Sequence, residues 1–319
     1  MPSGASYGAM TRPNLLPLVC GLLLAVRAAG AQPLPETAAT LPQEQHPLGV
    51  SRCSAECLDP ARLFQLNPPG RPWALRLDAE LGTVAVLSHE IQLGSDGTTF
   101  NYVADGGQDN LFLFARISAQ LTLRDRHHII LLYQPLDLRT AARFDQDHRI
   151  GGVDFRQGAA VDLRYGFDFY RLSYAYDLLP SRRHELSVGA TLQIRNATLT
   201  FTETGGGARY VSEDIGIVPA LKVRGRYTWV SGVFVGFEAD GIYATSSFLN
   251  GASYPFTGAI LDLSVRAGAH LWGPVEWYTN LRYLGGGAEG TSGDPAPPAD
   301  GRTRNWLHTM SLSLGFALR

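Results

Sequence analysis

Charged side chains recur at every second position in several segments of this 319-residue chain. Because residues two apart share one face of a β-strand, this spacing would gather the charges on one side of a sheet. Ten cations and ten anions have the phase that we assign to an inner face. The cations are Arg76, Arg116, Arg164, Arg171, Arg195, Lys222, Arg224, Arg226, Arg266 and Arg282. The anions are Asp78, Glu80, Asp162, Asp168, Asp177, Glu185, Glu238, Asp240, Asp262 and Glu276.

Two kinds of chemistry suit such a set of residues. In a narrow interior the charges would pair with one another, because a buried charge without a partner is costly. In a wider interior the same side chains would line a narrow aqueous path. The sequence leaves both interpretations open.

Other motifs predict little chemistry. Cys53 and Cys57 stand four residues apart; a local disulfide is favoured in an oxidising compartment, whereas a metal site would need about four ligands and only His46 stands nearby. The run Gly285–Gly290 matches the spacing G-x-G-x-x-G, but no helical pattern follows it, so nucleotide binding is not predicted. We predict no catalytic residue, no cofactor and no metal.

The charged positions belong to segments in which apolar and polar residues alternate, from Trp73 to the end of the chain. Long polar loops are expected near 89–108, 139–157, 204–214, 245–257 and 285–304. Short turns are expected at Arg124–His127, Pro180–Arg183, Trp229–Gly232 and Trp272–Pro274. Short turns at one end and long loops at the other are typical of an antiparallel up-and-down transmembrane β-barrel, with the short turns in the periplasm. We predict an all-β barrel of ten strands, with eight or twelve as alternatives.

The segment 159–179 is ambiguous, because its apolar phase slips by one residue. Val161, Leu163 and Phe169 share one phase, whereas Leu172 and Tyr174 share the other. A hairpin at 166–168 would explain the slip, but it would place later long loops at the wrong end. We therefore predict one long strand with a β-bulge near Tyr170.

The N-terminal residues predict export. The apolar run Leu15–Val26 and the small residues before Gln32 are typical of a signal peptide spanning residues 1–31, cleaved near Ala31. Residues 32–71 lack alternation and predict a flexible periplasmic arm, before a barrel over 72–319. Together these features predict the bacterial outer membrane as the location.

Composition limits the partners. Lys and Arg total 27 against 29 Asp and Glu, so the chain has no nucleic-acid-binding charge excess. The expected partners are outer-membrane lipid and the barrel-assembly machinery. The sequence does not determine the oligomeric state.

Several stretches resemble a family of small uncharacterised bacterial outer-membrane β-barrel proteins, over most of residues 73–319. The resemblance implies the fold and the compartment, but no activity. A departure is the end of the chain, where Phe316 is followed by three further residues although many such barrels end on an aromatic residue. The stretches that carry the resemblance are 97–102 with 106–110, 132–136, 170–176, 195–197, 218–221, 238–241 and 282–289.

The leading functional prediction is a non-enzymatic barrel, either a narrow or gated channel or a structural protein with external loops. One alternative is a rim-sited hydrolase, in which His148 and Asp145 or Asp147 would activate water. The ten-stranded outer-membrane proteases of the omptin type resemble this placement, although their sequence motifs are absent. A loop-based adhesin or receptor is a further alternative.

Overall fold

The computed structural model describes residues 71–179, 181, 183–246, 255–291 and 301–319. The expected signal peptide, the Cys53–Cys57 pair and all of the arm over 32–71 except its last residue lie outside the described residues. No helix in the described part of the chain is long and apolar enough to cross a membrane.

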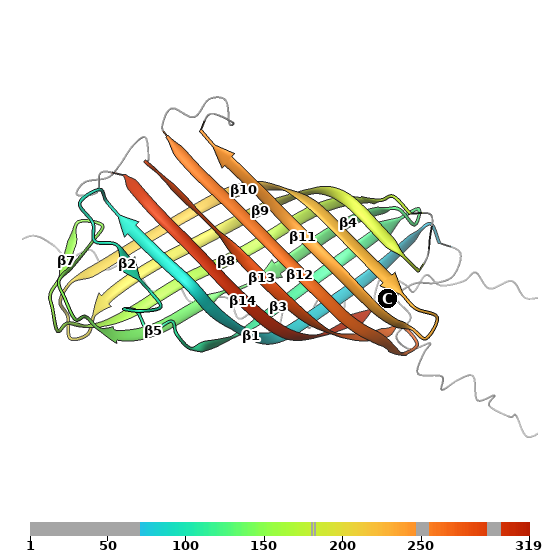
Figure 1. Ribbon diagram of the computed structural model, residues 1–319, viewed down its shortest axis with the longest axis horizontal. Coiled ribbons are helices and arrows are strands. Elements are labelled where there is room, and N and C mark those ends of the chain that lie inside the picture. Colours follow the sequence, from blue (N-terminus) through green and yellow to red (C-terminus); the bar gives the residue numbers. More distant parts are fainter. Residues whose placement is uncertain (1–70, 180, 182, 247–254, 292–300) are drawn as a thin grey trace, which may run out of the picture. The chain divides into compact units, whose positions relative to one another are not determined.

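The described residues form a closed antiparallel β-barrel (Figure 1). Its strands are β1 (Trp73–Leu93), β2 (Phe100–Asn101), β3 (Leu111–Leu123), β4 (His127–Gln134), β5 (Asp137–Arg143), β6 (His148–Ile150), β7 (Val153–Phe155), β8 (Ala160–Asp177), β9 (Glu185–Glu203), β10 (Arg209–Thr228), β11 (Val233–Thr245), β12 (Phe256–Trp272), β13 (Val275–Thr291) and β14 (Arg302–Leu318). Each wall strand pairs with the next one along the chain, and β14 pairs with β1 to close the wall.

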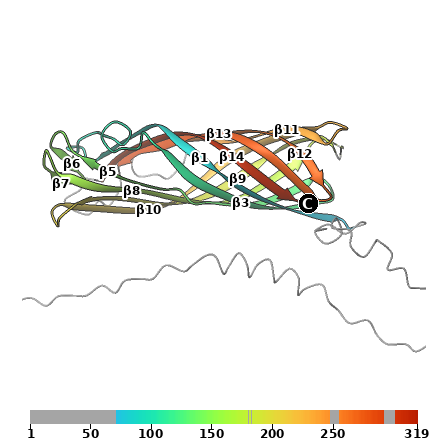
Figure 2. The same ribbon diagram turned by 90° about the horizontal axis from the view of Figure 1, so that it is seen from below.

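The wall contains ten strands, as the sequence predicts. β4 and β5 both pair with β8 and keep one register, since Gln134 faces Phe169 and Asp137 faces Gly166. They form a single wall strand that is interrupted at Pro135, which has no backbone N–H to donate. The strands cross the barrel obliquely, and the short elements β2, β6 and β7 lie at the long-loop end (Figures 1 and 2).

The outer face carries a band of exposed aliphatic and aromatic side chains. On β9 the band runs from Leu186 to Ile194, both about 40% exposed (37% and 41%). Nine residues at about 3.3 Å each, tilted by about 40°, span about 23 Å, close to the apolar height of a membrane barrel. Beyond this band the outer face of β9 becomes polar at Asn196, Thr198 and Thr200.

The predicted bulge near Tyr170 is wrong, although the prediction of one long strand is right. β8 keeps an unbroken register with β9 from Val161, which faces Glu203, to Asp177, which faces Ser187. The phase slip reflects a change of environment. Up to Phe169 the apolar residues of β8 face the barrel interior, and from Tyr170 onwards they face outward.

Three short turns lie where the sequence predicts them, and the fourth, Pro180–Arg183, lies partly outside the described residues, between β8 and β9. The wall strands are longer than expected. The predicted long loop 204–214 is wrong, because β9 and β10 pair as far as Thr202 and Arg209 and only a short turn joins them. The Gly285–Gly290 run lies within β13. The predicted loops 245–257 and 285–304 lie partly outside the described residues.

The long-loop end of the interior is filled by an apolar cluster, which we call the outer cap. Loop residues and inward-facing wall residues build it together. Its principal members are Ile91, Leu93, Phe100, Tyr102, Leu138, Phe144, Ile150, Phe155, Val161, Leu163, Tyr165, Leu199, Phe201 and Leu307.

Candidate functional site in the barrel interior

At the level of the apolar band the interior is charged. Eight cations and eight anions point inward there, and we call this set the ion network. It consists of Arg76, Arg116, Arg171, Lys222, Arg224, Arg226, Arg266 and Arg282 with Asp78, Glu80, Asp177, Glu185, Glu238, Asp240, Asp262 and Glu276.

Three of the residues assigned to the interior from the sequence lie on the outer face instead. Asp162, Arg164 and Asp168 occupy even positions of β8, and these positions point outward because the strand has no bulge. The Arg164 guanidinium donates to Asp137 at 2.8 Å, with both side chains about 30% exposed (29% and 31%). Arg195 does face inward, but it lies at the level of Phe167, 5.9 Å from that ring, and is not part of the ion network.

The layer of the network nearest the short turns is centred on Glu276, whose side chain is fully buried. Its carboxylate contacts Arg76 at 2.7 Å, Arg226 at 2.7 Å, Arg319 at 2.9 Å and His270 at 3.0 Å. One carboxylate thus serves three guanidinium groups. Arg76 is shared with a second acid, Asp78, at 2.8 Å.

The next layer contains Glu80, Glu238 and Lys222. Glu80 accepts hydrogen bonds from Asn280 at 2.9 Å and Ser313 at 3.0 Å, and Arg266 lies 3.2 Å from it. Lys222 is the only lysine in the chain. Its Nζ lies 2.6 Å from Glu238 Oε1 and 2.8 Å from Asp240 Oδ2, and the residue is 2% exposed.

The layer nearest the outer cap is held by arginines. Asp262 lies between Arg171 and Arg282, and the Arg282 Nε donates to its Oδ1 at 2.5 Å. Arg282 also donates to Gln134, and Thr191 donates to Asp240 at 2.5 Å. All of these groups are buried, and each acid has at least one cation.

Above the ion network the interior is mainly apolar, with Arg195, His89 and His148 among the hydrocarbon side chains. Leu132, Phe169, Ile260 and Leu284 form a small buried cluster, and the outer cap lies beyond it. Paired charges and then packed hydrocarbon therefore fill most of the described interior, apart from a small cavity of about 50 Å³ among Arg76, Arg116 and Glu238 and a larger one at the short-turn end.

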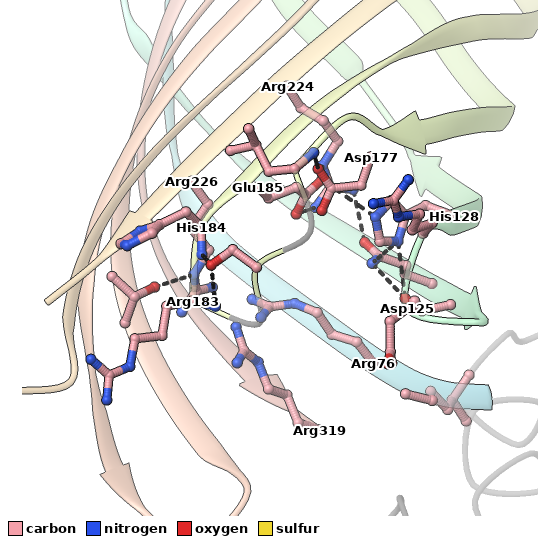
Figure 3. Close-up of a pocket in the computed structure, with 18 of the residues that line it drawn as sticks. Arg76, Asp125, His128, Asp177, Arg183, His184, Glu185, Arg224, Arg226 and Arg319 are labelled. Carbon is pink, nitrogen blue, oxygen red and sulfur yellow. Dashed lines mark hydrogen bonds and ion pairs between the residues drawn. The ribbon is translucent and has the colours of Figure 1, made fainter. Parts of the chain in front are cut away.

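The short-turn end is hollow by contrast. A cavity of about 700 Å³ opens there, and we call it the mouth (Figure 3). Figure 3 shows Arg76 of β1, Arg226 of β10 and Arg319, which follows β14, gathered at one opening. Its charged and histidine lining residues are Arg76, Arg124, Arg126, Arg183, Arg224, Arg226, Arg319, Asp125, Asp177, Glu185, His128, His184 and His270.

Four of these arginines were not among the sequence candidates. Arg124, Arg126 and Arg183 belong to the short turns, and Arg319 follows β14. The alternation of inward and outward residues holds only within strands, so it does not predict the direction of these four side chains. The available signal was the arginine content of the turns, because turns at one end of a barrel surround a single opening.

The acid–base pair of the alternative hydrolase prediction is not formed, since neither ring nitrogen of His148 has a hydrogen-bond partner within the described ranges. His148 is 1% exposed and packs against Phe100 and Phe144, with ring centroids 5.3 and 4.6 Å away. Asp147 points elsewhere, to Arg156 at 3.3 Å and to the backbone N–H of Gln157 at 2.7 Å. Burial lowers the pKa of His148, while these two bonds lower the pKa of Asp147.

Among the described residues, no cluster of three or more His, Cys, Asp or Glu side chains is arranged to hold a metal ion. The acids of the ion network pair with arginine or lysine side chains, except Asp177, which accepts the backbone N–H groups of Leu179 and Leu186. The fully buried carboxylates therefore neutralise fixed protein cations.

Comparison with known proteins finds only remote structural likenesses. The chain matches no known family model and no curated protein. It is similar to the outer-membrane protease OmpT from Escherichia coli (10% identity, 76% of this chain and 96% of that chain, TM-score 0.35). It is also similar to a Pseudomonas aeruginosa FadL homologue (7% identity, 77% of this chain and 90% of that chain, TM-score 0.36). A further similar structure is the transport unit of the autotransporter AIDA-I from Escherichia coli (10% identity, 81% of this chain and 94% of that chain, TM-score 0.36). With TM-scores of 0.36 or lower, these likenesses assign neither a family nor an activity to this chain.

Proposed function

We propose that the protein is a non-enzymatic barrel of the bacterial outer membrane whose interior is closed at rest. The observation that carries the proposal is the filled interior, in which a balanced ion network is followed by the outer cap. The apolar outer band, about 23 Å high, supports the membrane location. The loop-length rule assigns the short turns to the periplasm.

Conductance in a planar lipid bilayer tests the closed state. The refolded protein should insert and give no discrete conductance steps, because no continuous aqueous path crosses the ion network and the outer cap. Steps whose size changes in Arg224→Ala and Asp240→Ala variants would overturn the proposal, since both residues belong to the ion network. A circular dichroism spectrum of β-structure on the same sample controls for misfolding.

The single lysine offers a second and independent test. Lys222 is buried between two carboxylates, so an amine-reactive ester added to the folded protein should leave it unmodified. Peptide mass spectrometry separates this site from the terminal amine. Full modification in denaturant but none in the native barrel is expected, whereas rapid native modification would reveal an open interior.

A gated channel is the second candidate. The outer cap is built in part from segments that lie between wall strands, including Phe100 and Tyr102 after β1 and Phe144 after β5. Displacing these segments would open the interior at the long-loop end without unfolding the wall strands. Conductance steps that appear only when the cap is weakened, as in Phe100→Ala, would favour this function over a permanently closed barrel.

A further inference from the structure

The mouth at the short-turn end has an excess of positive charge that the rest of the interior lacks. The ion network contains equal numbers of cations and anions. At the mouth, four more arginines line the cavity, and one more acid, Asp125, accompanies them among the described residues. The described side chains of the mouth therefore carry a surplus of positive charge, before any protonation of its three histidines.

The contacts of these arginines leave donors that face the cavity. Arg319 shares Glu276 with two other guanidinium groups and is 38% exposed. Arg124 and Arg183 are exposed, and in the described part of the chain neither forms an ion pair. A guanidinium carries five N–H donors in a fixed fork, so these groups retain donors for an acceptor from outside the protein.

The acids near the mouth are already engaged. Glu185 contacts Arg224 at 2.8 Å, and Asp177 accepts the backbone N–H groups of Leu179 and Leu186 at 3.0 and 3.1 Å. Glu276 is fully buried behind the opening. Arginine N–H donors are therefore available at the surface of the mouth, because the neighbouring carboxylates already have other hydrogen-bond or ion-pair partners.

We propose that the mouth binds a small multivalent oxyanion, with at least two phosphate or carboxylate charges, from the side of the short turns. Arginine forks match the geometry of phosphate and carboxylate oxygens, and a concave cluster of them strengthens the local field. The cavity volume of about 700 Å³ lies in the range of small-molecule sites. On the closed interior proposed above, the ion network blocks the inner end of the mouth. The site is then a pocket with one opening, and a bound ligand can leave only at the short-turn end.

Isothermal titration calorimetry of the refolded protein tests this site, with inorganic pyrophosphate and citrate as probes and acetate as the monovalent control at matched ionic strength. Saturable binding of at least one multivalent probe, with no acetate binding, is expected. Pyrophosphate alone would assign phosphate chemistry, and citrate alone would assign carboxylate chemistry. Absence of binding by both would overturn the proposal.

Matched arginine variants locate the site. Arg183→Ala and Arg319→Ala should each weaken binding about 10-fold, which is the usual effect of losing one charge-assisted contact. Arg156→Ala is the control, because Arg156 is an exposed arginine at the opposite end that pairs with Asp147. Equal weakening by all three variants would indicate non-specific attraction and would refute a site at the mouth.

The two proposals can fail separately. Binding at the mouth requires only the cavity and its arginines, whereas the closed state requires the ion network and the outer cap. A conducting barrel that binds pyrophosphate at Arg183 would overturn the closed state alone. A silent barrel without binding would overturn the oxyanion site alone.

Discussion

Replacing Lys222 with methionine tests whether the ion network is dehydrated. The Lys222 Nζ lies 2.6 Å from Glu238 and 2.8 Å from Asp240; the contact with Asp240 is buried and the contact with Glu238 is partly buried. At an effective dielectric constant of about 20, each contact corresponds to about 6 kcal/mol of Coulomb attraction, before desolvation of the charges is subtracted. Methionine keeps much of the side-chain volume and removes the charge, so the substitution isolates the electrostatic contribution.

The remaining partners set the expected size of the effect. Glu238 keeps Arg266 at 3.7 Å and Arg116 at 3.8 Å, and Asp240 keeps Arg171 at 3.5 Å. Removing one member of a buried ion pair costs about 3–5 kcal/mol. Because neither acid loses its last cation, we expect Lys222→Met to cost about 3 kcal/mol of unfolding free energy.

Reversible urea unfolding of the refolded protein in lipid measures this difference. Arg156→Met is the control, because its pair with Asp147 is exposed at both side chains and should contribute less than about 1 kcal/mol. If Lys222→Met costs no more than Arg156→Met, water already solvates the network. That result would refute the dehydrated interior and with it the closed barrel.

Two further predictions concern the outer cap. Burial keeps the pKa of His148 below its usual value of about 6.5, so the opened cap takes up the proton more readily than the closed one. The outer cap should therefore have its full stability above about pH 6.5 and lose stability at lower pH. After correction for intrinsic rates, amide hydrogen exchange over 144–159 should be faster at about pH 5.5 than at about pH 7.5. His148→Phe should remove the difference, and a pH effect that survives this change would contradict the assignment. Phe100→Ala should cost about 3–5 kcal/mol in urea unfolding, since Phe100 is fully buried, while the control Val230→Ala, 85% exposed, should cost little; equal costs would show that Phe100 contributes no packing to the cap.

The sequence was sufficient for the wall of the barrel. Alternation is a local property, and within a regular strand such as β10 it correctly separates outward Leu221 and Val223 from inward Lys222 and Arg224. The number of wall strands follows because each reversal of direction leaves turn residues or a polar loop. These features need no information about distant parts of the chain.

Alternation does not identify the environment of each face. On β8 the apolar phase was taken to face lipid along the whole strand, but Leu163 and Phe169 face the interior. The outer cap that receives Leu163 also contains residues of other segments, including Phe100 and Phe155, which were predicted as parts of polar loops. The aromatic residues within those loops were the signal that an apolar core continues beyond the membrane band.

The polar outer face beyond the band restricts how such a barrel can be assembled. Asp162 and Arg164 lie on the outside of β8, and Thr200 has the same position on β9. A charged side chain in the centre of a bilayer costs about 2.5–3.5 kcal/mol. Sliding a finished cylinder with this exterior through hydrocarbon would carry these polar groups into the bilayer, so we expect the long-loop end to cross the membrane while the wall is still open. Pairing of β1 with β14 would then close the barrel after the loops have crossed.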